Sequence, residues 1–145
     1  MTIVASIALL LGSAQAQAVA PNPPPPPPCN RRRAEQGIQT DMNICAQNDY
    51  RRADQAMNAQ WKRTLSVMRN RDRDAAPYAD TMRGPGYAQA LTQAQRAWIA
   101  WRDANCRVEG YAARGGSLEP MLVSFCKTEM TKLRLVELRE LARSI

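Results

Sequence analysis

One stretch in the second half of the chain, residues 95–106, constrains the fold most. It reads Gln-Arg-Ala-Trp-Ile-Ala-Trp-Arg-Asp-Ala-Asn-Cys. Apolar residues within and just before it recur at helical spacing, and they are Leu91, Ala94, Trp98 and Trp101. Gln95, Arg102 and Cys106 lie on one flank of that apolar stripe. Two tryptophans offer more apolar surface than any other predicted element, so the other helices are expected to pack around this one.

Two further segments repeat apolar residues at threes and fours, which is typical of amphipathic helices. The first follows a cap at Thr40 or Asp41 and contains Met42, Ala46, Tyr50, Ala53, Met57, Trp61, Thr64 and Met68. The last begins near Ser117, and its residues expected to face inward are Leu118, Leu122, Phe125, Met130, Leu133 and Val136. The chain is long enough for one domain.

Helix breakers separate these segments. Residues 69–74 are charged and show no apolar pattern, and Pro77 and Gly84-Pro-Gly86 follow them. A short helical turn is expected between these breakers, around residues 78–82. Because no stretch alternates polar and apolar residues with a period of two, the predicted fold is all-α. It has three main helices in a small bundle that disulfides hold together.

Four cysteines suit a disulfide framework if the chain leaves the cytosol. Three pairings are open to four cysteines. Cys106 and Cys126 lie ten residues before and after Gly116, so a helical hairpin would place both thiols about 15 Å from its turn. Cys29 and Cys45 are close in the chain. The favoured pairing is therefore Cys29–Cys45 with Cys106–Cys126.

The N-terminus indicates export. Residues 3–11 form a short apolar run, and small residues that resemble a signal-peptide cleavage site follow it. Residues 1–20 are thus predicted to be a signal peptide, 21–28 a stiff proline-rich linker and 29–145 the folded domain. The apolar run is too short to span a bilayer. The predicted location is the periplasm or the exterior of the cell.

The formal net charge of +7 belongs entirely to the residues after position 30. Such a surface attracts polyanions. Nucleic acid is not the predicted partner, because the basic residues are scattered over all helices and export removes the usual target. An anionic polymer of the cell envelope or a lipid headgroup is the expected acidic partner.

Asp54, Asn58, Gln95 and Arg102 form a polar group at the edges of the predicted apolar stripes. Carboxylate, amide and guanidinium groups beside tryptophans could make a binding site. They could equally make a satisfied polar seam that fixes the register of the helices, and this is the favoured interpretation. Arg102 is expected to face the first long helix near Asp54 or Asn58.

No catalytic, cofactor-binding or metal-ligating residues are predicted. The chain has no histidine, which removes the usual general base and the commonest metal ligand. There is no Cys-x-x-Cys pair to begin a zinc site. Ser117 and Ser124 lack a base partner, and no glycine-rich phosphate loop follows a strand. The chain is therefore expected not to be an enzyme.

Three groups of residues resemble the LprI-like lysozyme inhibitor family, long catalogued as a domain of unknown function. The first is Asp41-Met-Asn-Ile-Cys-Ala46 with Tyr50, Ala53-Asp54, Met57-Asn58 and Trp61. The second is Ala94-Gln-Arg-Ala-Trp-Ile-Ala-Trp-Arg-Asp-Ala-Asn-Cys106. The third is Gly115-Gly116-Ser117 with Cys126, Thr131, Arg134 and Leu138. The resemblance implies a small exported bacterial helical domain with paired cysteines and a role in inhibiting lysozyme.

The predicted function is that of a non-catalytic cell-envelope protein that binds a protein or envelope partner, with lysozyme as one candidate. The alternative is a structural or stress-related envelope domain that contacts anionic cell-wall or outer-membrane polymer. Because C-type lysozymes are strongly basic, as this chain is, inhibition is expected to depend on a local acidic or shape-complementary patch.

Overall fold

The apolar repeats of the sequence form three long helices. These are α2 (Gln39–Ala75), α3 (Tyr87–Gly110) and α4 (Glu119–Arg143). A short helix, α1 (Arg31–Glu35), precedes them, and two 3₁₀ turns, η1 (Ala76–Thr81) and η2 (Tyr111–Ala113), follow α2 and α3. No strand occurs in the residues that the structure describes. The prediction of an all-α fold with three main helices and a short turn between the first two is confirmed.

This computed structural model describes residues 25–81 and 83–143, without the side chains of residues 79 and 80. The predicted signal peptide, residues 1–20, lies outside this part of the chain, as does the first half of the predicted linker. Residues 25–28 are described and adopt no regular secondary structure.

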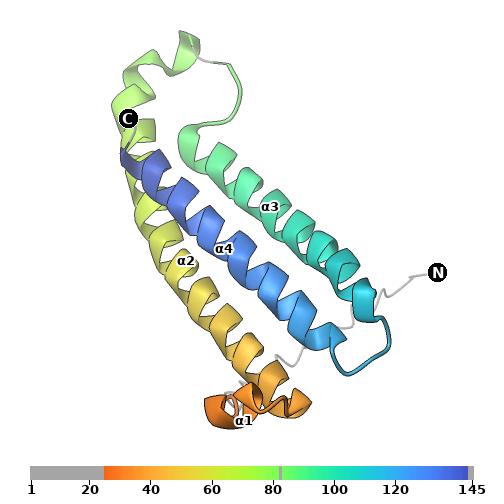
Figure 1. Cartoon of the computed structure of the whole chain (residues 1–145). Coiled ribbons are helices and arrows are strands. Elements are labelled where there is room, and N and C mark those ends of the chain that lie inside the picture. Colours follow the sequence, from red (N-terminus) through yellow and green to blue (C-terminus); the bar gives the residue numbers. More distant parts are fainter. Residues whose placement is uncertain (1–24, 82, 144–145) are drawn as a thin grey trace, which may run out of the picture.

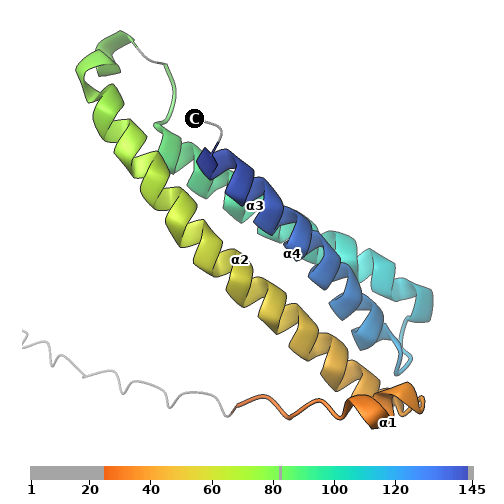
Figure 2. The ribbon, with the colours of Figure 1, turned by 60° about the vertical axis from the view of Figure 1, so that its left-hand side comes forward.

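The long helices lie side by side, and α3 runs opposite to α2 and α4 (Figure 1). With 37 residues, α2 is 12 residues longer than α4 and projects past the C-terminal end of α4 (Figures 1 and 2). The apolar core lies between the three helices and is made of Met57, Met68, Leu91 and Leu138. Trp61, Leu65, Trp98, Leu135 and Leu141 pack around that cluster.

The inner face of α4 is made mainly of hydroxyl side chains, and the sequence-based assignment of this face was wrong in part, since Leu122 and Met130 are half-buried but four other residues are not. The buried residues of α4 are Ser124, Thr128, Thr131 and Leu138. Phe125, Leu133 and Val136, expected inside, are exposed. Small hydroxyl side chains suit a close approach of α4 to α2. They are satisfied there because the Ser124 and Thr128 hydroxyls donate to carbonyls one turn earlier, at 2.8 and 2.7 Å.

The buried face of α3 is also displaced from the predicted stripe. Its buried residues are Leu91, Gln95, Arg102, Cys106 and Gly110. Trp101 is 58% exposed, and Ala94 is exposed too. The polar flank of the predicted stripe is therefore the true inner face. This arrangement is stable because Gln95 and Arg102 find hydrogen-bonding partners inside the bundle.

The charged residues 69–74 continue α2, although their sequence has no apolar pattern. The carboxylate of Asp72 accepts hydrogen bonds from the backbone N–H groups of Tyr87 and Ala88, at 2.6 and 3.0 Å. It thereby caps the start of α3 from a neighbouring helix. Gly86 allows this approach, because a Cβ there would lie 2.7 Å from an Asp72 carboxylate oxygen.

At the other end, α2 begins without the side-chain cap expected from Thr40 or Asp41. Ile38 occupies the N-cap position and makes no side-chain capping bond. Asp41 lies in the first turn and accepts a hydrogen bond from Nε of Arg33 at 2.8 Å. The carboxylate therefore links α2 to the short helix α1, where it also suits the positive end of the α2 dipole.

Two disulfides lie toward the same end of the bundle, where α2 and α4 begin and α3 ends. Cys29 is bonded to Cys45, with the two Cα atoms 4.7 Å apart, and ties the leader to α2. Cys106 is bonded to Cys126, with a Cα separation of 5.4 Å, and ties α3 to α4. The structure leaves no cysteine free. These are the two predicted bonds. Proximity in the chain favoured Cys29–Cys45, and the antiparallel helical hairpin favoured Cys106–Cys126.

Replacing Cys106 and Cys126 together by serine should lower the free energy of unfolding by about 3 kcal/mol, because the closed loop restricts the unfolded chain. Guanidinium chloride unfolding without reductant measures this. Wild type with reductant is the control, and it should lose at least as much. An unchanged free energy of unfolding in the variant would show that this bridge does not stabilise the domain.

Candidate functional site

Arg102 is the centre of the polar group predicted from the sequence, and its side chain is only 4% exposed. Its Nη1 donates to Thr131 Oγ1 on α4 at 3.1 Å and to Asp54 Oδ1 on α2 at 3.3 Å. Its Nε donates to Asp103 Oδ1 at 3.0 Å. One guanidinium thus contacts all three long helices, and its planar fork is suited to several acceptors at once.

Aromatic rings flank this guanidinium. The Cζ atom of Arg102 lies 5.3 Å from the ring centre of Tyr50 and 5.2 Å from that of Trp98. Each ring faces a second cation, since Lys127 lies over Tyr50 and Arg134 over Trp98, at 5.6 and 5.7 Å. These distances are within the range of cation–π attraction, which is stronger for desolvated groups.

The four residues predicted to group together lie along one layer, but not all of them touch. Arg102 contacts Asp54, whereas Asn58 donates to the other oxygen of Asp54, at 2.8 Å, and does not reach the guanidinium. Gln95 is buried, its Oε1 accepts from Nε of Arg134 at 3.0 Å, and its Nε2 lies 3.6 Å from the sulfur of Met57. We call this group of four the polar seam.

Sequence reasoning missed five members of the surrounding cluster, which are Tyr50, Asp103, Lys127, Thr131 and Arg134. Tyr50 precedes Asp54 by one helical turn, so its place on the same face could have been read from the spacing. The ion pair between Lys127 and Asp103, at 3.2 Å, follows from the register that the Cys106–Cys126 bond imposes. Thr131 and Arg134 carried no spacing signal toward the seam, although both belong to the third group of residues that resembles the LprI-like family.

The protonation states of the cluster suit structure rather than proton transfer. Burial raises the pKa of Tyr50 above its ordinary value, and Asp54 and Asp103 reinforce this while Arg102 opposes it. Burial also acts to raise the pKa of Asp103, but hydrogen bonds from Arg102 and Lys127 outweigh it and lower that pKa. The phenol therefore stays protonated and the carboxylate ionised near neutral pH, so neither serves as a general acid–base group there.

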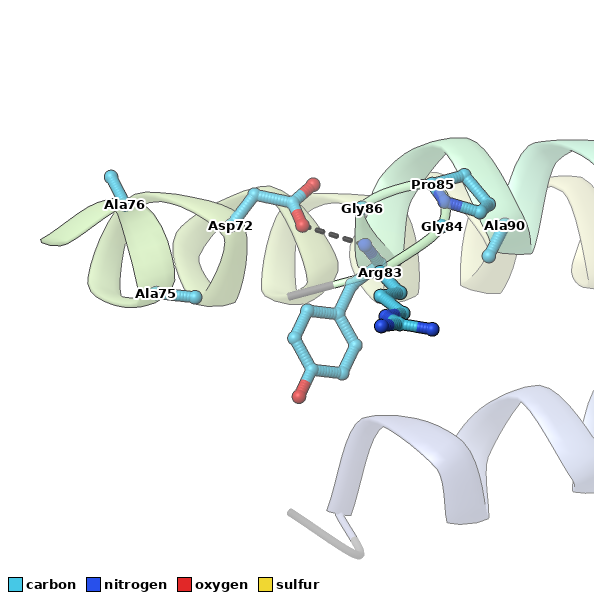
Figure 3. Close-up of a pocket in the computed structure, with 9 residues that line it drawn as sticks. Asp72, Ala75, Ala76, Arg83, Gly84, Pro85, Gly86 and Ala90 are labelled. Atoms are coloured by element: carbon cyan, nitrogen blue, oxygen red, sulfur yellow. Dashed lines mark hydrogen bonds between the residues drawn. The ribbon is translucent and has the colours of Figure 1, made fainter. Parts of the chain in front are cut away.

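A cavity of about 710 Å³ lies between the end of α2 and the start of α3. It is lined by Asp72, Ala75, Ala76, Arg83, Gly84, Pro85, Gly86, Tyr87 and Ala90. Figure 3 shows Asp72 reaching from α2 toward the first residues of α3. Both oxygens of the Asp72 carboxylate accept hydrogen bonds from backbone N–H groups there. Among the described lining residues, Arg83 is the other charged one.

In residues 25–81 and 83–143, no three cysteine, aspartate or glutamate side chains gather in a way that could hold a metal ion. No helix in this part of the chain is long and apolar enough to cross a membrane. The same residues contain no buried side-chain nitrogen or oxygen without a hydrogen-bond partner.

The family described as lysozyme inhibitor LprI matches residues 29–138. The chain belongs to the LprI lysozyme inhibitor family. The matched range begins at the first cysteine of the disulfide pairs and includes every residue of the Arg102 cluster. The LprI match therefore covers the whole disulfide-linked part of the bundle and ends within α4.

An uncharacterized protein of Rhizobium meliloti (strain 1021) is 46% identical over 110 residues. The aligned part covers 73% of this chain and 75% of that relative. No solved structure matches the chain. In this LprI-family chain, the three long helices pack around Arg102.

Replacing Arg102 by alanine should lower the free energy of unfolding by about 3 kcal/mol, because it leaves the carboxylates of Asp54 and Asp103 without their buried partner. Arg102→Lys should also lose stability, since an ammonium group cannot reproduce the fork or the stacking. Chemical unfolding measures both, with Arg107→Ala on the exposed side of α3 as the control, expected within about 0.5 kcal/mol of wild type. Unfolding curves for both Arg102 variants that match the control would contradict the role of the seam.

Asp103 should make the stability of the domain decrease at low pH. Its pKa is lower in the folded state than in the unfolded chain, so its contribution is present above about pH 4 and is lost as pH falls through the folded pKa. Asp103→Asn should be less stable than wild type at neutral pH, and the difference in melting temperature should shrink toward about pH 2. Glu109→Gln, at an exposed carboxylate of α3, should follow the wild-type curve. A constant difference between Asp103→Asn and wild type at every pH would refute this assignment.

Proposed function

We propose that this protein is a non-catalytic, exported cell-envelope protein that acts by binding, and that lysozyme is its candidate partner. The LprI family match over residues 29–138 carries this proposal, because the family is described as a lysozyme inhibitor. The match includes all the helices that build the folded domain. The activity of the family therefore provides the first function to test.

The chemistry of the described residues supports binding rather than catalysis. The buried polar groups around Arg102 are engaged with one another and hold the three helices in register. The chain has no histidine to act as a base near neutral pH. A rigid, fully hydrogen-bonded bundle is well suited to present a preformed surface to a partner.

Two observations support export. Both cysteine pairs form disulfides, which persist outside the reducing cytosol. The apolar run at residues 3–11 and the small residues after it have the pattern of a signal peptide. We propose that residues 1–20 are removed and that the mature domain, residues 29–145, acts in the periplasm or outside the cell on a proline-rich spacer.

Most carboxylates of the described residues are already engaged, which leaves few of them for an acidic docking patch. Seven carboxylates of the described residues take part in ion pairs, and they are Asp41, Asp49, Asp54, Asp103, Glu129, Glu137 and Glu140. Asp72 and Glu119 accept hydrogen bonds from backbone N–H groups at helix starts or turns. A basic lysozyme would therefore be recognised by shape and apolar contact.

An exposed apolar surface on α3 and α4 suits such contact. Trp101 on α3 and Leu133 on α4 are 58% and 66% exposed. The Asn105 side chain of α3 lies 3.8 Å from the sulfur of Met130, which places Trp101 and Leu133 about one turn away on neighbouring helices. Exposed tryptophan is the side-chain type that most often dominates binding energy at protein interfaces.

Lysozyme activity titrated with the mature domain tests this function. Inhibition is expected from wild type, and Trp101→Ser should weaken it by about 2 kcal/mol, or roughly thirtyfold, with an unchanged melting temperature. Tyr78→Ser, an exposed aromatic on η1, is the matched control. Absence of inhibition by folded wild type at any ratio would exclude the inhibitor function, whereas equal inhibition by both variants would exclude only the Trp101 surface.

The second candidate function is contact with an anionic envelope polymer, as a structural or stress-related domain. The net charge of +7 favours it, and so does the presence of exposed cations on α2 that have no carboxylate partner among the described residues.

A further inference from the structure

The middle part of α2, between Asp54 and Asp72, carries positive charge without any acidic residue. Between Asp54 and Asp72 the sequence contains four cations and no carboxylate. Three of them, Lys62, Arg63 and Arg69, are exposed, whereas Arg71 is half-buried and contacts the sulfur of Met68. Arg73 is exposed one turn after Arg69. We call Lys62, Arg63, Arg69 and Arg73 the basic stripe.

Helical geometry places these cations on the solvent side of α2. Lys62, Arg69 and Arg73 are separated by seven and four residues, so they point in nearly one direction and span about 16 Å along the axis. Arg63 lies on their flank. The opposite side of the same segment, with Met57, Thr64 and Met68, is buried. In Figure 2, α2 runs along one flank of the bundle with a side that faces away from α3 and α4.

The stripe differs from those surface cations that are paired with a carboxylate. Arg52, Lys132 and Arg143 are each paired with a carboxylate three residues away on the same helix. In the part of the chain that the structure describes, no carboxylate lies within ion-pair distance of Lys62, Arg63, Arg69 or Arg73. Between Asp54 and Asp72 the positive potential is therefore not offset by an ion pair, and it is available to an external anion.

We infer that the basic stripe of α2 binds a linear, phosphate-bearing polymer of the cell envelope. This inference rests on the second function proposed above and is independent of lysozyme inhibition. Three of the four cations are arginines, whose planar forks match phosphate oxygens in pairs. A flexible chain with regularly spaced phosphates can follow a straight row of cations along one helix.

The surface chemistry of α2 favours a polymer over a lipid bilayer. Helices that lie on membranes insert an apolar face between the headgroups. The large apolar side chains that are exposed in the described residues lie before α2 or on η1, α3, η2, α4 and their connections, and none is on α2. Exposed aromatic side chains for stacking nucleic-acid bases are likewise lacking on α2, within the described residues.

The test compares two triple variants of the mature domain that remove equal charge. The stripe variant is Lys62→Gln, Arg63→Gln and Arg69→Gln, and the control variant is Arg52→Gln, Lys132→Gln and Arg143→Gln. Both lose three positive charges from exposed helical positions. Binding to inorganic polyphosphate and to phosphatidylglycerol vesicles is measured at several salt concentrations, and thermal melts verify that both variants fold.

The stripe variant should bind polyphosphate about tenfold or more weakly than the control variant. A plot of log affinity against log salt concentration should be less steep for the stripe variant, by about two to three in slope, because fewer counterions are released. Equal weakening of both variants would overturn the stripe as the site while leaving polymer binding by net charge. Stripe-dependent binding to vesicles but not to polyphosphate would overturn the polymer as the ligand. No polyphosphate binding by wild type at low salt would refute both this inference and the second function.

Discussion

The buried guanidinium of Arg102 is the group on which the packing of the three helices depends. It donates to Asp54 on α2, to Asp103 on α3 and to Thr131 on α4, between the rings of Tyr50 and Trp98. A buried charge is costly unless it is paired and hydrogen-bonded. A shift of any helix along its neighbour would leave the guanidinium or a carboxylate unsatisfied, so this contact favours the observed register together with the Cys106–Cys126 bond.

The polar interior of the bundle also explains why large apolar side chains are exposed on α3 and α4. The faces of α3 and α4 that point inward carry Arg102, Gln95 and hydroxyl side chains, and much of their apolar surface is consequently turned outward, at Trp101, Leu133 and Val136. The disulfide between α3 and α4 adds a covalent link beside the apolar core. The bundle thus presents an apolar α3–α4 surface that suits protein contact and a basic, hydrophilic α2 surface that suits anions.

Local rules predicted a large part of the fold. The spacing of apolar residues located three helices, and the breakers around Pro77 and Gly84 located the turn between the first two. The positions of the four cysteines about the helical hairpin favoured the pairing that the structure contains. The neighbourhood of Arg102 and Asp54 also followed from helical positions. These features depend on periodicity and chain distance, which are properties of the sequence alone.

Tertiary structure decided which face of each helix is inside. Counting apolar residues placed Trp101 and Phe125 in the core, but burial depends on whether polar groups find partners across the interface. Thr131 and Arg134 reach the site because α4 lies against α3. Asp72 caps α3 because α2 continues past the end of the apolar pattern. The sequence by itself therefore determined the helices, their order and their covalent links. Hydrogen bonds between residues far apart in the chain determined how each helix is rotated about its axis and which residues it contacts.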